Sequence, residues 1–467
     1  MSELALAGRV VELVRRLAGP ETQAEVVAAH AAEALTRFAN SAIHQNVADA
    51  TTTVRLRLHL DGRTASGSTT RTDSDGLQAL VERTIAAARL SPPDAAWPGL
   101  TPPSPLHPFE ELDEATAQAT PEERAARVRD FVAAAGGLET AGYCRTNYAS
   151  AAFANTAGQA VEGRFAEAAM DGIARTGGAD GVARLASGRL AELDGAALGA
   201  RAAAKARAAG RPIELPPGRY EVILEPDAVA DMLGNMAAFG FNGKSFAQRQ
   251  SFAELGAQQF DSSVTLVDEP IGGPGAPAPD LPFDTEGTPR ATLALVEEGF
   301  TVGVTHDRSS AAEVGAVSTG HASPSSRGWG PYGTHLRLVP SSGVPSSGPA
   351  TAPEQTGPTA ESSRALVAGL ERGLLITDFW YTRVLDQKSL VITGLTRNGV
   401  WLVENGEVTA AVSNMRFTQS YPQALGPGAV RAIGSQAVML PDRWSGVRFT
   451  APAVHLASWN LTGNASG

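Results

Sequence analysis

The sequence contains one cysteine, few aromatic residues and no long apolar run. Because Cys144 has no second cysteine to pair with, the chain cannot form an intramolecular disulfide, which suits a reducing compartment. A membrane helix needs about 18 or more apolar residues without charges, and no such stretch occurs. The acidic, amphipathic N-terminal segment does not resemble a signal peptide. We therefore expect a cytoplasmic protein that does not act at a membrane.

Positive charge is also scarce. The chain has 38 Lys and Arg against 49 Asp and Glu, a net charge of −11 and a pI near 5.3. Nucleic-acid binding depends largely on clustered basic side chains, so no nucleic-acid partner is expected. With 43% hydrophobic and 19% charged residues, the composition is that of a folded protein. Because 467 residues exceed what one hydrophobic core usually supports, two domains are predicted.

Residues 1–212 are predicted to form a mixed α/β domain. Alternating apolar and polar residues at 54–60, followed by Asp61-Gly62, indicate a β-hairpin. The region 92–108 contains seven prolines, so a long irregular loop is expected there. Helices are predicted after an N-cap at Ser2, over 77–90, from Pro121 and over 195–209, and strands at 143–153 and 161–169.

Residues 213–467 are predicted to form a second, β-rich domain, which makes the fold class α+β. One helical stretch is expected near 226–239. Asn405-Gly406, between the apolar runs 400–403 and 408–412, is the strongest hairpin signal because Asn-Gly tolerates positive φ at both positions. The Ser/Gly/Pro-rich tract 322–360 is predicted to be a mobile loop or an insertion.

A catalytic zinc site on a helix needs two histidines about one turn apart, with a glutamate beside one of them. No two of the eight histidines have that spacing, and none is followed by Glu. A metal site could instead combine His306, Asp307, His321 and His335, although their spacing fits no known ligand pattern. Ordinary loop or surface histidines are the simpler interpretation.

Three other features have a structural explanation that we favour over a catalytic one. Asp284 and Glu286 could be paired carboxylates, but a turn completed by Gly287 is the simpler reading. Cys144 lies in a strand-like run, as a buried structural thiol would. Residues 328–333 match GxGxxG without a strand before or a helix after, so no dinucleotide site is expected. The basic run of residues 201–211 is expected to be a solvated helix face.

Four segments together resemble the TldD/PmbA family, once called modulators of DNA gyrase: RFANSAIHQ at Arg37–Gln45, FDTEG at Phe283–Gly287, STGHA at Ser318–Ala322 and WLVENGEV at Trp401–Val408. The resemblance covers nearly the whole chain and implies a mixed α/β domain followed by a β-barrel-like domain. The TldD branch of this family holds zinc with an HExxxH helix and a distant cysteine. The matching segment here, Asp227–Met236, has no histidine, and the expected cysteine falls near Gly434-Ser435. The chain thus resembles the TldE (PmbA) branch, which has no metal site of its own.

This resemblance implies a non-catalytic subunit that pairs with a TldD-like zinc peptidase acting on unfolded or extended peptides. Zinc is then expected in the partner, with no catalytic or metal-binding residue in this chain. Ser318, Thr319, Gly320 and His321 are the candidates for shaping a cleft or a subunit interface. Two alternatives stay open: an autonomous peptidase with an unrecognised site, in which His306 and His321 would be essential, and a stand-alone peptide-binding homo-oligomer.

Overall fold

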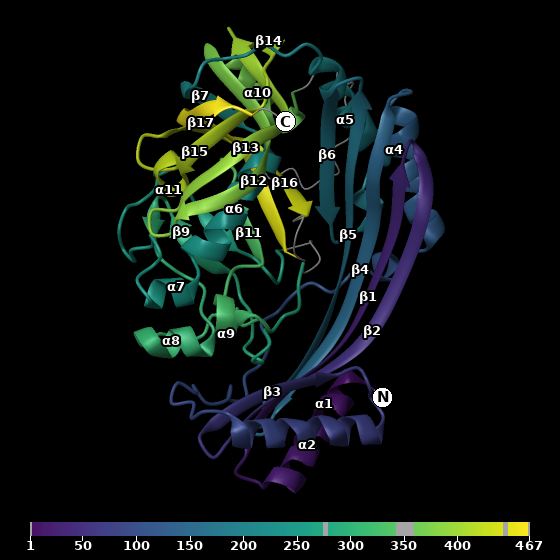
Figure 1. The fold of residues 1–467 in the computed structure, drawn as a ribbon, viewed down its shortest axis with the longest axis vertical. Coiled ribbons are helices and arrows are strands. Elements are labelled where there is room, and N and C mark those ends of the chain that lie inside the picture. The colour runs from purple at the N-terminus through teal and green to yellow at the C-terminus, as the bar shows by residue number, and fades with distance from the viewer. Residues whose placement is uncertain (1, 274–278, 342–358, 442–446, 466–467) are drawn as a thin grey trace.

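The computed structural model describes residues 2–273, 279–341, 359–441 and 447–465. It is an α+β protein with one sheet in each half of the chain, as expected (Figure 1). Among the described residues, no helix combines the length and the apolar character needed to cross a membrane.

The N-terminal sheet has six antiparallel strands in the order β3-β2-β1-β4-β5-β6. Its strands are β1 (Gln23–Ala39), β2 (Ala42–Leu60), β3 (Arg63–Thr69), β4 (Glu139–Asn155), β5 (Ala160–Thr176) and β6 (Ala179–Ser187). Asp61 and Gly62 both have positive φ and connect β2 to β3, which confirms the predicted hairpin. The proline-rich segment 92–108 is irregular, also as predicted.

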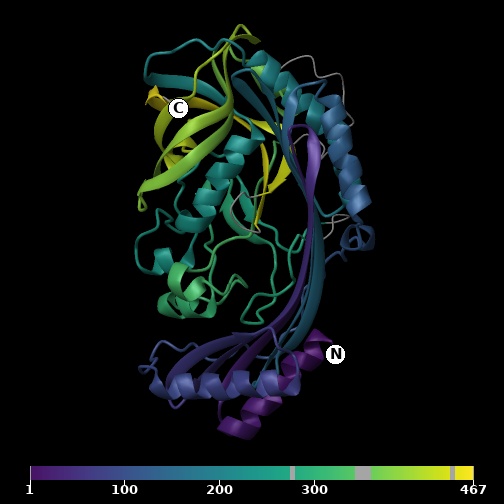
Figure 2. The same ribbon diagram turned by 45° about the vertical axis from the view of Figure 1, so that its right-hand side comes forward.

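Helices cover one face of this sheet at both of its ends, and Figure 2 shows the sheet curving between the two groups. These helices are α1 (Glu3–Ala18), α2 (Ser74–Leu90), α3 (Glu114–Ala117), α4 (Pro121–Ala134) and α5 (Gly195–Ala208). The Ser2 hydroxyl accepts from the Ala5 amide at 3.3 Å, so the predicted N-cap is confirmed. Thr120 and Glu123 form a capping box at α4, with Pro121 in its first turn.

Strand alternation divides β1 between two layers. Its even-numbered residues Val26, Ala28 and Phe38 are buried in the cores beneath the helices. Its odd-numbered residues Val27 and Ala29 pack on the other face, in a cluster with Phe153 of β4 and Phe283 of the C-terminal half. The sheet is therefore the middle layer, with helices on one face and the C-terminal domain on the other (Figure 1).

The C-terminal half forms an eleven-stranded sheet. Its strands are β7 (Gly218–Leu224), β8 (Leu266–Asp268), β9 (Leu293–Glu297), β10 (Phe300–Thr301), β11 (His335–Leu338), β12 (Arg372–Asp386), β13 (Val391–Glu404), β14 (Glu407–Ala411), β15 (Met415–Ser420), β16 (Val430–Pro441) and β17 (Arg448–Asn464). The pairings β17-β15-β13-β12-β7 close on themselves because β7 also pairs with β17. The other strands extend outward from β17 and β13. The expected barrel-like layout is thus a partial ring within a larger sheet.

The helices of this half connect and cover the strands: α6 (Pro226–Asn235), the π-helical turn Met236–Gly240, α7 (Gly243–Ala247), α8 (Arg308–Val314), α9 (Ser326–Trp329), α10 (Glu361–Ala368) and α11 (Tyr421–Ala424). Part of the tract predicted as a loop is ordered, since α9 and β11 lie within 322–360. Its residues 342–358 fall outside the described part of the chain. Strand β11 forms there because residues 335–337 pair in parallel with β17.

Buried ion pairs join the two halves, and here the prediction of a solvated basic helix face was wrong for Arg201 and Lys205 of α5. Lys205 and Glu225 are both fully buried, with Nζ 2.6 Å from Oε2. Two hydrogen-bond donors, the Ala360 amide and the Ser363 hydroxyl, complete the environment of Glu225. Burial opposes the charge of this carboxyl, but Lys205 and Arg201 lower its pKa to about 2. Arg201 and Lys205 therefore fix the C-terminal half against the N-terminal half, whereas Arg207 is exposed.

Candidate functional site

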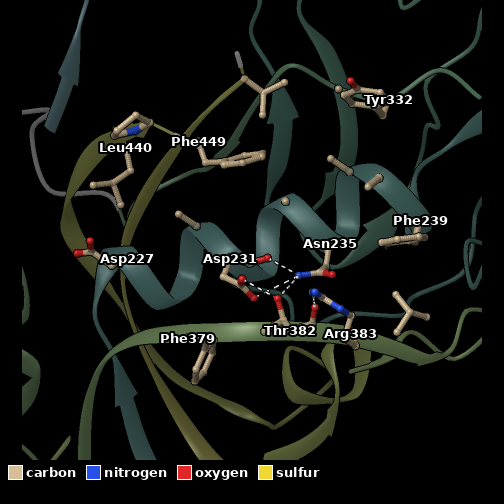
Figure 3. Close-up of a pocket in the computed structure, with 18 of the residues that line it drawn as sticks. Asp227, Asp231, Asn235, Phe239, Tyr332, Phe379, Thr382, Arg383, Leu440 and Phe449 are labelled. Carbon is tan, nitrogen blue, oxygen red and sulfur yellow. Dashed lines mark hydrogen bonds between the residues drawn. The ribbon is translucent and has the colours of Figure 1, made fainter. Parts of the chain in front are cut away.

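A cavity of about 750 Å³ lies in the C-terminal half between α6 and β12 (Figure 3). The α6 helix and the π-helical turn form one wall, and residues 379–384 of β12 form the opposite wall. Residues from the ends of β16 and β17 and from the loop around α9 complete the lining.

A small polar network spans these two walls. Asp231 and Asn235 lie one turn apart on α6, so both side chains face β12. The Thr382 hydroxyl donates to Asp231 Oδ1 at 2.9 Å, and Asn235 Nδ2 lies 3.2 Å from Asp231 Oδ2. The Tyr421 hydroxyl donates to Asp231 Oδ2 at 3.1 Å, and burial together with this carboxylate raises the Tyr421 pKa. Both oxygens of Asp231 therefore already accept hydrogen bonds.

Aromatic side chains dominate the rest of the cavity. They are Phe239, Trp329, Tyr332, Phe379, Trp380, Tyr381 and Phe449. Phe239 and Trp329 meet edge to face with ring centroids 5.4 Å apart. Trp329 is 52% exposed and Tyr381 62% exposed, and Arg383 lies 4.1 Å above the Tyr381 ring. Large exposed aromatic surfaces around a hollow are typical of a binding site for apolar or extended ligands.

The motif residues 318–321 lie outside this cavity, in a buried hydrogen-bond network. His321 Nε2 is 2.8 Å from Asp268 Oδ2, and its Nδ1 is 2.8 Å from the Thr319 hydroxyl. The Ser318 hydroxyl donates to the His306 carbonyl at 3.3 Å. Gly320 has a φ of 76°, and a Cβ there would lie 2.8 Å from the Pro289 carbonyl oxygen. A role for Ser318, Thr319, Gly320 and His321 at a cleft or an interface stays a prediction.

The other histidines of the conceivable metal cluster have separate partners. His306 Nδ1 is 3.1 Å from the Ser310 hydroxyl, and His335 Nε2 is 3.2 Å from the Thr450 hydroxyl. Asp307 caps α8 by accepting from the Ser310 amide at 2.7 Å. Within the described residues, no group of three or more His, Cys, Asp or Glu is arranged to hold a metal ion.

Asp284 and Glu286 form the turn that we predicted. Asp284 Oδ1 accepts from the amides of Glu286 and Thr288, both at 2.9 Å, and Gly287 has a φ of 72°. Asp284 Oδ2 accepts from the Ala322 amide, so this carboxylate connects the turn to the 318–322 motif. Cys144 is buried as expected, and burial raises the pKa of its thiol to about 12.

Comparisons with known proteins agree with this architecture. Residues 217–463 match the family model described as the PmbA/TldA metallopeptidase C-terminal domain, and residues 24–88 match PmbA/TldA metallopeptidase domain 1. The chain therefore belongs to the TldD/PmbA metallopeptidase family. Comparison with curated protein sequences gave no match.

Three solved structures share the fold over almost the full chain. TldE from Thermococcus kodakarensis has a TM-score of 0.83 at 16% identity, with 98% of this chain and 99% of that chain covered. A candidate modulator of DNA gyrase from Thermotoga maritima has a TM-score of 0.80 at 17% identity, with 97% and 99% covered. Another, from Bacteroides thetaiotaomicron, has a TM-score of 0.79 at 18% identity, with 98% of each chain covered.

The residues on α6 do not fit the zinc ion that a metallopeptidase of this family implies. Zinc in proteins is held mainly by histidine and cysteine, with carboxylates as additional ligands. Residues 226–235 contain neither histidine nor cysteine. Asp227 faces Arg184 at 3.0 Å and Arg201 at 3.7 Å. Both oxygens of Asp231 accept the hydrogen bonds described above. The carboxylates of this helix are therefore already paired with side chains of neighbouring elements.

The sequence reasoning located the helix but missed the aromatic lining. Trp329 and Tyr332 lie in the segment 328–333, whose only sequence signal is a match to GxGxxG. Trp380 and Tyr381 adjoin a β-bulge between Trp380 and Arg383, and Tyr381 has a φ of 54°. Bulges re-aim side chains near functional sites, but nothing in the local sequence marks this one. The spacing of Asp231 and Asn235 on α6 was the available signal for a polar site.

Proposed function

We propose that this chain is a non-catalytic, TldE/PmbA-like subunit that completes a TldD–TldE-type zinc metallopeptidase for flexible peptides. The observation that carries the proposal is a hydrogen-bond network at the helix where the TldD branch holds its metal, in which Asp231 and Asn235 of α6 bond to each other and Asp231 bonds to Thr382 of β12 and Tyr421 of α11. The same network connects α6 to β12 and so holds together the two walls of the aromatic cavity. The catalytic zinc then belongs to a TldD-like partner in the cytoplasm.

The aromatic cavity supports a role in holding peptide. Exposed Trp329 and Tyr381 offer ring faces to side chains of any sequence. Such a surface binds extended chains with little sequence preference. In the complex, the cavity would retain a peptide while the partner cleaves it.

The test compares the chain alone with the chain co-expressed with a TldD-like protein. With zinc and an unstructured peptide such as casein, the isolated chain is expected to show no cleavage above background. The co-expressed proteins should co-elute in size-exclusion chromatography, contain zinc by metal analysis and cleave the peptide in a chelator-sensitive manner. Chelator-sensitive cleavage by the isolated chain, or failure of the two proteins to associate, would contradict the proposal.

Tyr381→Ala is expected to weaken peptide capture about tenfold, because removing an aromatic anchor at a binding surface commonly costs more than 1 kcal/mol. The measurement is the Kd of a labelled unstructured peptide for the co-expressed complex, by fluorescence anisotropy. Leu385→Ala is the matched control, since Leu385 lies on the same strand, is 60% exposed and does not line the cavity. Equal losses in both variants would show that the cavity does not bind the peptide.

A further inference from the structure

A second cavity, of about 530 Å³, lies between the two halves of the molecule. One side is formed by β1, β2, β3 and the proline-rich loop, including Glu25, Arg57 and Trp97. The other side is formed by the turn at Glu286 and by α8 and α9. Figures 1 and 2 both show α8 and α9 facing the end of the N-terminal sheet that carries β3. This cavity shares no lining residue with the one between α6 and β12.

An unbalanced ion-pair cluster lies at the wall of this cavity. Glu25 and Arg57 are directly opposite each other on β1 and β2, and Arg57 Nε donates to Glu25 Oε1. Arg57 Nη2 also donates to Glu286 Oε1 at 2.8 Å. Two buried carboxylates therefore share one guanidinium, which leaves one negative charge without a counterion in this group.

The uncompensated atom is Glu25 Oε2. Glu286 Oε2 accepts from the Arg308 amide at 2.9 Å, so Glu286 is satisfied. Glu25 is only 4% exposed, and among the described residues its Oε2 has no hydrogen-bond partner. A buried carboxylate oxygen without a donor is costly, because the group has lost water and gained nothing in return. Glu25 lines the cavity while its Oε2 is buried, so a turn of the carboxylate toward the cavity would let a ligand supply the missing donor.

Besides Arg57, three cations line this cavity: Arg55 is exposed, and Lys244 and Arg327 are directed elsewhere. The Lys244 ammonium donates to the carbonyls of Arg327 and Gly328 at 2.9 and 2.8 Å. Arg327 is mostly exposed and lies 4.0 Å from Asp94. Further acceptors line the wall, namely Asp307 and the hydroxyls of Ser66 and Ser68. The cavity therefore combines a buried excess of negative charge with several hydrogen-bond acceptors.

We propose that this cavity binds a primary ammonium group, which donates to Glu25 Oε2 and neutralises the Glu25–Arg57–Glu286 cluster. A primary ammonium carries three N–H donors and one positive charge, so it can satisfy Glu25 and neighbouring acceptors together. The group can belong to a small free amine or to the amino terminus of a peptide. The proposal goes beyond the subunit role above and does not depend on it.

Ammonium binding should depend on pH in a defined direction. Burial raises the Glu25 pKa to about 7; Arg57 on β2 opposes this shift, and Glu286 and Asp284 on the opposite turn add to it. Because the ligand needs the ionised carboxylate, affinity should increase as pH rises through 7. From pH 6 to pH 8, we expect a gain of about tenfold for an alkylamine, set by the ionised fraction of Glu25. The gain is smaller for a peptide, because its amino terminus loses its own proton at about pH 8.

The test is isothermal titration of the full chain with three probes: n-butylamine, tetra-alanine amide with a free amino terminus, and the same peptide N-acetylated. At least one free amine is expected to bind, and the acetylated peptide should bind about tenfold more weakly or not at all. If n-butylamine binds as well as the free peptide, the ammonium alone is recognised; if only the free peptide binds, the site recognises an amino terminus. Either result supports the proposal.

Glu25→Gln keeps the size of the side chain and removes the excess charge, so binding should fall at least tenfold and its pH dependence should disappear. Glu111→Gln is the control, because Glu111 is a largely exposed acid outside the cavity. The probe comparison and the pH series use the unmodified protein, so they hold even if Glu25→Gln unfolds. The proposal is overturned if neither free amine binds at about 10 mM, if the free peptide binds and acetylation does not weaken it, or if folded Glu25→Gln binds equally well.

Discussion

Replacing Arg184 with methionine is expected to destabilise the folded protein by about 3–5 kcal/mol, the usual result of removing one partner from a buried charge cluster. Arg184 on β6 lies 2.8 Å from Asp171, 3.0 Å from Asp227 at the start of α6 and 3.0 Å from Asp378 on β12. Burial opposes its charge, but the three carboxylates raise its pKa above the usual range. Without Arg184, the Asp227 and Asp378 carboxylates stay buried with fewer compensating donors.

Arg175→Met on the neighbouring strand is the matched control. Arg175 pairs with Asp180 at 2.6 Å, but its side chain is 52% exposed, so its loss should cost less than about 1 kcal/mol. The measurement is urea unfolding followed by circular dichroism, with midpoint and slope compared for both variants. A lower slope for Arg184→Met would indicate that the two halves unfold separately, which we expect if this cluster joins them. Equal, small effects would show that Arg184 is not a principal link.

A second large effect is expected from pH, through His335. Burial lowers its pKa from 6.5 to about 4, more than the nearby Asp268 raises it. Its Nδ1 is buried without a partner among the described residues, so a proton there would have no acceptor. The folded state thus favours the neutral ring. The stability that the protein gains from keeping His335 neutral is fully present above pH 6.5. It is lost as pH falls toward 4, and the total loss is about 3 kcal/mol.

Other buried groups change the stability with pH in the opposite direction, so the effect of His335 must be isolated by substitution. Burial raises the pKa of Glu25 to about 7, which makes the folded state favour its protonated form, and the Asp284 pKa is raised too. Their contributions decrease as pH rises, opposite in sign to that of His335. In the unmodified protein, the pH-dependent contributions of His335 and of these two carboxyls therefore partly cancel between about pH 4.5 and 6.5.

His335→Gln removes the titrating ring and keeps a polar group near Thr450. The free energy of unfolding of this variant, relative to the unmodified protein, should improve by about 3 kcal/mol between pH 7 and pH 4. His44→Gln is the control, because His44 is exposed on β2. If the difference between His335→Gln and the unmodified protein does not change with pH, His335 does not titrate in the way that its burial implies.

Much of the fold was predictable because its signals are local. The N-cap at Ser2, the capping box at Thr120 and the turns at Asp61-Gly62 and Asn405-Gly406 each depend on residues within a few positions of one another. Such signals place helix starts and hairpins correctly. The α6 helix was located in the same way, together with its lack of histidine.

The contacts that join distant parts of the chain could not be read from local sequence. The sequence around Lys205 on α5 predicts a solvated cation, but in the structure this side chain pairs with Glu225, which lies 20 residues away in the sequence. Glu286 meets Arg57 across 229 residues, and Trp329 meets Phe239 across a loop without regular pattern. Chain topology determines such pairs, whereas hydrophobic periodicity reports only which face of an element is buried. For that reason the polar cluster at Glu25 has no counterpart in the sequence interpretation.

The length of β1 constrains how this protein can evolve. One uninterrupted strand of 17 residues places Val26 beneath α1 and α2 and Phe38 beneath α4. Because neighbouring residues point to opposite faces, inserting or deleting one codon between them would turn one of the two anchors to the wrong side. Changes of two codons would keep both anchors facing inward. Natural length variation in this stretch should therefore occur in even steps.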